Sequence, residues 1–250
     1  MTVLLCHQDS YLKTFDAVVT GVDEALHAVK LDQTAFYPGG GGQPGDTGVL
    51  RQAEATYRVT GLRRVGGEIW HVLEGEALPV VGAPVQGEID WARRYQLMRI
   101  HTAMHILCGV VWRDYGASVT GGNMEPLRGR MDFEFERLSK ALVQEIEARV
   151  NLEVNARRPV RVAVLPREEA FQIPDLIRTR INLLPAGITE VRVVEIVGLD
   201  LQADGGTHVA NTIEVGPMRI PRYTSKGGIN KRLYVELDEA YRVETDAATD

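Results

Sequence analysis

The hydrophobic period of this sequence changes at Asp90, and that change constrains its fold more than any other feature. Before Asp90, short β-branched or alternating runs are separated by Gly, Pro and Asp, which is typical of strands. From Trp91 to Tyr115 there is no Pro, the first Gly is Gly109, and apolar residues recur at helical spacing. Asp90 is a suitable N-cap for this helix. We therefore expect a β region followed by a region that opens with a long helix.

These patterns predict an α+β protein with two domains. Residues 1–90 are predicted to form a small antiparallel β-barrel-like or sandwich domain, and residues 91–250 an α+β domain. Further helices are predicted from Ser139 to Asn155 and, briefly, after Pro166. Strand-like runs in the second region are MDFEFE, VRVAVL, TEVRVVEIV, ANTIEV and LYVELDEAYRVE. The long first helix is expected to pack on the sheet that these strands form.

The composition is that of an ordinary globular protein and excludes a disordered chain, a collagen and a coiled coil. Hydrophobic residues make up 44%, charged residues 25%, and the net charge is −6. All of this acidity lies in residues 1–90, which carry 6 Lys and Arg against 12 Asp and Glu. The two cysteines, Cys6 and Cys108, the lack of a signal-like N-terminus and the lack of a membrane-length apolar run predict a reduced, cytoplasmic protein.

Two separated motifs suggest a metal site. His101 and His105 lie one helical turn apart, which places both imidazoles on one face of the predicted helix. Asp204 and His208 flank Gly-Gly-Thr about 100 residues later. Three imidazoles and a carboxylate are ligands that suit tetrahedral Zn²⁺. The alternative to a metal site is that each histidine is a hydrogen-bonded core residue, because spacing alone does not show that the two motifs meet.

The two motifs together resemble the editing domain of alanyl-tRNA synthetases and the free-standing alanyl-tRNA editing (AlaX) proteins. That family pairs an H-x-x-x-H helix with a segment of the form Q-x-C-G-G-T-H, and this chain has HTAMH and QADGGTH. Asp204 stands where the family has cysteine, which keeps the formal charge but replaces a soft ligand with a hard one. The resemblance implies one Zn²⁺ per chain, held by His101, His105, Asp204 and His208.

A glycine-rich segment, AFYPGGGGQPGDTG over residues 35–48, resembles the family's F-Y-P-x-G-G-G-Q-x-x-D. It formally contains G-x-G-x-x-G, but Pro44 and a strand follow where a dinucleotide site needs a helix, and no Walker A lysine is present. We therefore expect no nucleotide cofactor, and a plain surface hairpin is the alternative. The resemblance implies that Thr34, Gln43 and the glycines contribute to catalysis or substrate binding, with Thr34 selecting serine. The glycines concerned are Gly40, Gly41 and Gly42.

A basic strip near the C-terminus suggests contact with nucleic acid. Residues 215–235 carry five basic side chains and no acidic one. Of these, Lys226 and Arg232 match basic positions of the family and are predicted to bind substrate. Arg93, Arg94 and Arg99 form a second candidate cluster. A solvated charged face is the alternative for either group.

The resemblance implies the medium-sized, free-standing form of the family. The predicted activity is trans-editing, in which an aminoacyl-tRNA deacylase hydrolyses the ester of a mischarged alanine tRNA at its acceptor end. The esters concerned are Ser-tRNA(Ala) and Gly-tRNA(Ala). His101 and His105 would belong to the catalytic centre. Two alternatives stay open, a zinc-stabilised tRNA-binding module without catalysis and a metallohydrolase of small esters.

Overall fold

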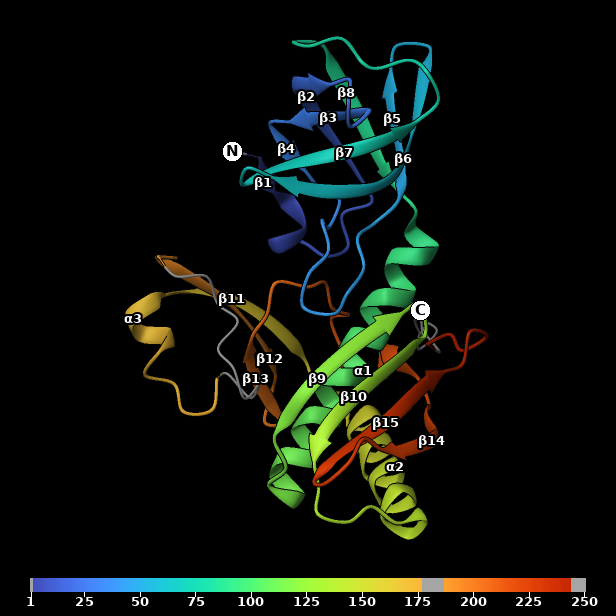
Figure 1. The fold of residues 1–250 in the computed structure, drawn as a ribbon, viewed down its shortest axis with the longest axis vertical. Helices are drawn as coiled ribbons and strands as arrows, with labels where there is room; N and C mark the ends of the chain where they lie inside the picture. The colour runs from blue at the N-terminus through green and yellow to red at the C-terminus, as the bar shows by residue number, and fades with distance from the viewer. Residues whose placement is uncertain (1, 177–186, 244–250) are drawn as a thin grey trace, which may run out of the picture. The chain divides into compact units, whose positions relative to one another are not determined.

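The computed structural model describes residues 2–176 and 187–243. The chain divides into two compact units, Met1–Tyr95 and Gln96–Asp250, with the division inside the first long helix. Figure 1 labels the helices and strands of both units.

Unit 1 is built on a closed antiparallel barrel in the order β2-β3-β7-β6-β5-β8, which is one of the two architectures that the alternating runs predicted. Outside the barrel, a short strand β1 pairs in parallel with β4. The elements are β1 (Val3–Leu4), a 3-10 helix η1 (Leu5–His7), β2 (Thr14–Asp23), β3 (Ala28–Leu31), β4 (Gln33–Thr34), β5 (Gly48–Gln52), β6 (Ala55–Val65), β7 (Glu68–Glu74) and β8 (Pro84–Ile89).

The barrel interior follows from the period-two pattern of its strands. On β2, Phe15, Ala17 and Val19 are buried while their neighbours face outward. Two glycines make room for this packing. A Cβ atom at Gly87 would lie 2.2 Å from the Phe15 ring, and one at Gly48 would lie 2.2 Å from a backbone carbonyl oxygen of β8. The barrel therefore closes tightly only because these two positions lack side chains.

The described part of unit 2 contains three α-helices and two sheets, which agrees with the predicted α+β class. One sheet has the order β14-β15-β10-β9 and the other the order β11-β12-β13. The elements are α1 (Trp91–Tyr115), β9 (Val119–Glu125), β10 (Arg128–Glu134), α2 (Lys140–Asn155), β11 (Val160–Pro166), α3 (Arg167–Ala170), β12 (Glu190–Ile196), β13 (Asp200–Ala203), a 3-10 helix η2 (Thr212–Val215), β14 (Met218–Ser225) and β15 (Asn230–Leu237).

Helix α1 is a central helix rather than a surface one. Every residue from Leu97 to Val111 is buried, so the helix is covered all round and not on one apolar face alone. One neighbour is the larger sheet, where a Cβ atom at Gly129 of β10 would lie 2.8 Å from the Met104 sulfur. The Asp90 carboxylate caps its start by accepting the Arg93 N–H at 3.2 Å, as predicted.

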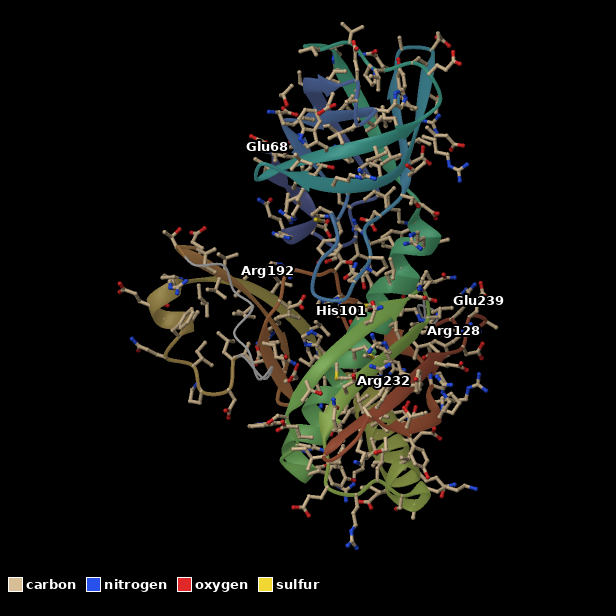
Figure 2. The ribbon with its side chains drawn as sticks, viewed as in Figure 1. Glu68, His101, Arg128, Arg192, Arg232 and Glu239 are labelled. Atoms are coloured by element: carbon tan, nitrogen blue, oxygen red, sulfur yellow. The ribbon has the colours of Figure 1, made fainter. Side chains whose placement is uncertain are left out.

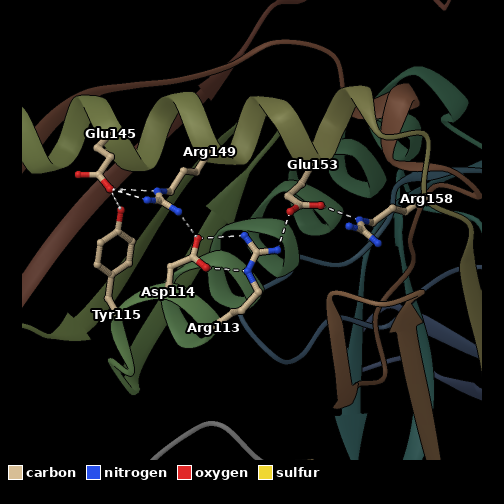
Figure 3. Close-up of polar contacts among 7 residues, drawn as sticks. All are labelled: Arg113, Asp114, Tyr115, Glu145, Arg149, Glu153 and Arg158. Carbon is tan, nitrogen blue, oxygen red and sulfur yellow. Dashed lines mark hydrogen bonds and ion pairs between the residues drawn. The ribbon is translucent and has the colours of Figure 1, made fainter.

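The last turn of α1 is joined to α2 by a chain of charged groups (Figure 3). Arg113 pairs with Glu153 at 2.6 Å, and Asp114 pairs with Arg149 at 3.1 Å. The set is completed by Tyr115, Glu145 and Arg158. The network therefore connects the end of α1 to α2 at several points.

The local predictions and the structure differ in two places, at residues 210–215 and at residues 119–125. Within the run ANTIEV, expected as a strand, Thr212–Val215 form the 3-10 helix η2, because the Asn211 side chain caps it and Glu214 completes a capping box. The basic strip of residues 215–235 is mostly the hairpin of β14 and β15. Strand β9 was not predicted, since its sequence VTGGNME is weak in β-formers.

Both cysteines are free and buried, as expected of a reduced protein. No helix among the described residues is long and apolar enough to cross a membrane.

Candidate metal centre

Four side chains that are distant in sequence meet in unit 2. His101 and His105 project from α1, while Asp204 and His208 come from the segment that follows β13. One ligand atom from each lies within 4.8 Å of all the others. The Asp204 carboxylate lies 3.4 Å from Nε2 of His101 and 3.8 Å from Nε2 of His105. The structure thus brings the two predicted motifs together, which spacing alone did not establish.

The segment that carries Asp204 is held by its own backbone and by α1. The Asp204 N–H donates to the carbonyl oxygen of Arg192 on β12 at 3.1 Å, and the Arg192 guanidinium donates back to the Asp204 carbonyl oxygen at 2.8 Å. The second carboxylate oxygen of Asp204 accepts the Gly206 N–H at 2.5 Å. Beyond His208, the Val209 N–H donates to the hydroxyl of Thr102 on α1 at 3.2 Å. These bonds fix both ends of the segment; His101 and Arg192 are labelled in Figure 2.

A close approach of α1 to the start of β13 adds another carboxylate. A Cβ atom at Gly109 would lie 2.9 Å from the Leu199 side chain and 3.2 Å from Cβ of Asp200. Because glycine leaves that space free, Asp200 reaches the helix, and its Oδ2 lies 2.8 Å from Nδ1 of His105. Asp200 was not among the predicted site residues, because nothing in its strand-like surroundings distinguishes it from a surface aspartate.

The charges in the cluster shift its pKa values in different directions. Burial opposes protonation of His105, but hydrogen bonds to Asp200 and Asp204 raise the pKa of this ring to about 9. Burial disfavours the charged form of Asp204, yet the neighbouring histidines hold the pKa of this carboxyl well below its usual range. Burial and the charges of His101 and His105 lower the pKa of His208 well below normal. A divalent cation would therefore displace a proton from His105 at neutral pH.

The predicted residues of the glycine segment lie in unit 1. Thr34 is fully buried, and its hydroxyl lies 2.9 Å from Nε2 of His71 and accepts the Phe36 N–H. Gly40 and Gln43 exchange two backbone hydrogen bonds, at 3.0 and 2.9 Å, and Gln43 is buried. Gly40, Gly41 and Gly42 all have positive φ angles, which explains why this turn needs glycine.

The prediction of an RNA-binding cluster at Arg93, Arg94 and Arg99 is wrong for two of its members. Arg94 is fully buried and pairs with Asp46 at the end of the glycine segment, with its Nε 3.0 Å from the carboxylate. Arg99 is buried and donates to the carbonyl oxygens of residues 215 and 238. Both guanidinium groups form hydrogen bonds inside the protein, with a carboxylate and with backbone carbonyl oxygens from distant segments. They are therefore not available for binding RNA.

The two predicted basic residues of the hairpin differ in their surroundings. Lys226 is exposed in the turn between β14 and β15. Arg232 on β15, labelled in Figure 2, makes a two-pronged contact with Asp132 of β10 at 2.6 and 2.7 Å. Nearby, the Arg222 guanidinium lies 3.8 Å from the centre of the Tyr234 ring.

Comparison with known proteins adds to this geometry. Residues 7–93 match the family model described as tRNA synthetases class II (A), and residues 191–234 match the threonyl and alanyl tRNA synthetase second additional domain. The alanyl-tRNA editing protein AlaX-M of Saccharolobus solfataricus is 39% identical over 236 residues, which are 94% of this chain and 98% of that protein. The chain belongs to the alanyl-tRNA editing protein AlaX-M family.

Other relatives support this assignment. AlaX-M of Methanosarcina barkeri is 38% identical over 242 residues, covering 95% of this chain and 99% of that protein. An alanine--tRNA ligase of Ignicoccus hospitalis is 40% identical over 222 residues, or 86% of this chain, but these are 24% of the ligase. The domain match at 191–234 contains Asp204 and His208 but not the two histidines of α1.

Proposed function

We propose that this AlaX-M family member is a trans-editing deacylase that hydrolyses Ser-tRNA(Ala), and Gly-tRNA(Ala), at the acceptor end. The observation that carries the proposal is the convergence of His101, His105, Asp204 and His208 in a chain that aligns almost end to end with editing proteins. The need for such an enzyme is physical, because a pocket for alanine rejects smaller or similar side chains only modestly. This activity belongs in the cytoplasm, where tRNA is charged.

The metal that we propose for the cluster is Zn²⁺, one per chain. Three imidazoles and one carboxylate match the ligands that zinc takes in proteins, and their donor atoms already lie close together. Asp204 supplies the same formal charge as the usual cysteine, but as a harder ligand. When bound, zinc supplies Lewis acidity and a fixed point for orienting the ester.

Thr34 is proposed to distinguish serine from alanine. Nδ1 of His71 faces the Val29 carbonyl oxygen at 3.2 Å and must carry the ring proton, so Nε2 accepts the Thr34 hydroxyl proton. The Phe36 N–H occupies one lone pair of the Thr34 oxygen, and the other is proposed to accept the hydroxyl of a serine ester when the acyl group binds. Alanine would leave that acceptor unpaired, at a cost in binding. Gln43 and the glycine turn at residues 40–42 are proposed to shape the acyl pocket.

Lys226 and Arg232 are proposed to contact the tRNA backbone. Of the two, exposed Lys226 is the stronger candidate for a phosphate contact, because Asp132 already neutralises the Arg232 guanidinium. Lys226→Gln should therefore weaken tRNA binding without changing the thermal stability of the protein.

The test is hydrolysis of Ser-tRNA(Ala), with Ala-tRNA(Ala) and a chelator-treated sample alongside. We expect rapid loss of serine, little loss of alanine, and inactivity after chelation or in a His101→Ala, His105→Ala double variant. His7→Ala, which changes a histidine of η1 outside the cluster, is the control.

Each alternative has its own outcome. Full activity in the double variant would refute the role of the metal. Tight tRNA binding without deacylation would favour the binding module. Hydrolysis of small serine esters as fast as of the tRNA ester would favour a small-ester hydrolase.

A further inference from the structure

We infer that Asp200 is a positioning residue, which holds His105 in the tautomer and orientation that present Nε2 to the metal. This inference rests on the proposed metal site and concerns a residue outside its four ligands. The Asp200 side chain has 0% exposure, and its Oδ2 lies 2.8 Å from Nδ1 of His105. The opposite ring nitrogen, Nε2, is the one that faces Asp204 at 3.8 Å.

The tautomer follows from hydrogen-bond chemistry. An ionised carboxylate only accepts, so Nδ1 of His105 carries the hydrogen when it bonds to Asp200. A neutral imidazole with its hydrogen on Nδ1 has its lone pair on Nε2. The two carboxylates therefore have separate tasks. Asp204 lies among the donor atoms of the cluster, while Asp200 lies behind the ring and selects which nitrogen can bind a cation.

Asp200 is itself held in place, which a positioning residue requires. It is the first residue of β13, where it pairs with Ile196 of β12. The Gln202 side chain donates to the same Oδ2 at 2.8 Å. Gly109 of α1 leaves the space in which the Asp200 side chain approaches the helix. A strand, a side-chain donor and a close backbone approach thus fix the carboxylate from three directions.

The electrostatic consequence can be estimated. The proposed ligands carry one negative charge, from Asp204, against the two positive charges of the ion. Asp200 supplies a second buried negative charge next to a ligand, so the whole site with its metal approaches neutrality. Losing a hydrogen-bonded carboxylate of this kind lowers metal affinity about 10- to 100-fold.

The first experiment measures metal affinity rather than turnover. The dissociation constants of Zn²⁺ and Co²⁺ would be measured by competition with a chromophoric chelator for the full chain and for Asp200→Asn. Asparagine keeps the size and an acceptor but removes the charge. We expect the dissociation constant to rise about tenfold or more, with a changed Co²⁺ absorption spectrum. Glu195→Gln, which removes a nearby charge on β12 that no contact joins to His105, should change it less than about twofold.

Unchanged affinity and an unchanged spectrum in a folded Asp200→Asn protein would overturn the inference. If that variant does not fold, ¹⁵N chemical shifts of His105 in the zinc-loaded wild type decide the question. We expect a protonated Nδ1 and a metal-bound Nε2, and the reverse arrangement would refute the assignment. A wild-type chain that binds no metal would instead overturn the proposed metal site, and this inference with it.

Discussion

Replacing His71 with glutamine should remove a pH-dependent loss of stability from unit 1. The ring is fully buried in the barrel, between the Val29 carbonyl oxygen and the Thr34 hydroxyl. Burial lowers the pKa of His71 from 6.5 to about 4, although its bond to Val29 favours the charged form. The folded ring therefore stays neutral at a pH where the unfolded ring is already protonated.

The sign and size of the effect follow from proton linkage. Above about pH 6.5 both states are neutral at His71, and the residue adds no pH dependence. Between about pH 6.5 and pH 4 the unfolded state binds the extra proton, so the free energy of unfolding falls as the pH falls. At about 1.4 kcal/mol per pH unit the loss reaches about 3 kcal/mol, and below pH 4 it stops growing.

Urea unfolding at several pH values, from about 7.5 to 4.5, would measure this loss for the wild type and for His71→Gln. Both proteins would carry Trp112→Phe, so that fluorescence reports Trp70 and Trp91 of unit 1. Because glutamine makes different contacts from histidine, the free energy of unfolding of the variant will also differ from that of the wild type by an amount that does not depend on pH. The quantity that tests the reasoning is the difference in the free energy of unfolding between the two proteins, which should shrink by about 2.5 kcal/mol across this range.

The reasoning would be refuted if that difference did not change with pH, or if NMR showed the His71 ring titrating near 6.5 in the folded protein. Val65→Ala is the control, because it changes an exposed side chain of the same barrel that does not titrate and should leave the wild-type slope unchanged.

Three further predictions concern stability. Gly48→Ala should lower the free energy of unfolding by about 2 kcal/mol or more, because the new methyl group meets the backbone of β8, whereas Gly61→Ala, with open space around it, should change it little in the same urea titration. Arg94→Leu should cost about 3–5 kcal/mol, because it leaves the Asp46 carboxylate buried without its partner; a denaturant midpoint equal to that of the wild type would contradict this. Ser139→Ala should remove the cap of α2 and cost about 1 kcal/mol, measured by thermal unfolding followed by circular dichroism, and an unchanged melting temperature would exclude a capping role.

Local signals in the sequence predicted the elements well where the cause is itself local. The change of period at Asp90 and the cap at Ser139 correctly predicted α1 and α2, because side-chain spacing and capping act within one or two turns. The 3-10 helix η2 had a local signal too, since Asn211 and Glu214 have capping-box spacing. The β-branched and apolar residues of the same run also favour a strand, so the two local signals conflict there.

Long-range partners were much harder to predict. Arg94 and Arg99 were expected at a surface because arginine usually lies there, but their partners come from segments up to 139 residues away. The meeting of His101 and His105 with Asp204 and His208 was predicted through family resemblance, not through spacing. Asp200 was missed for the same reason as the arginines: its role depends on which helix passes beside its strand, and local spacing and composition do not show which helix that is.

Gly109 shows that a site can depend on a residue without any functional group. If the four ligands and Asp200 were grafted onto another helix and strand, ordinary side chains at the position of Gly109 would keep the two elements apart. The Asp200 carboxylate would then miss the His105 ring, although every chemically active residue had been copied. A design that transfers this centre must therefore copy the empty space beside the helix together with the ligands.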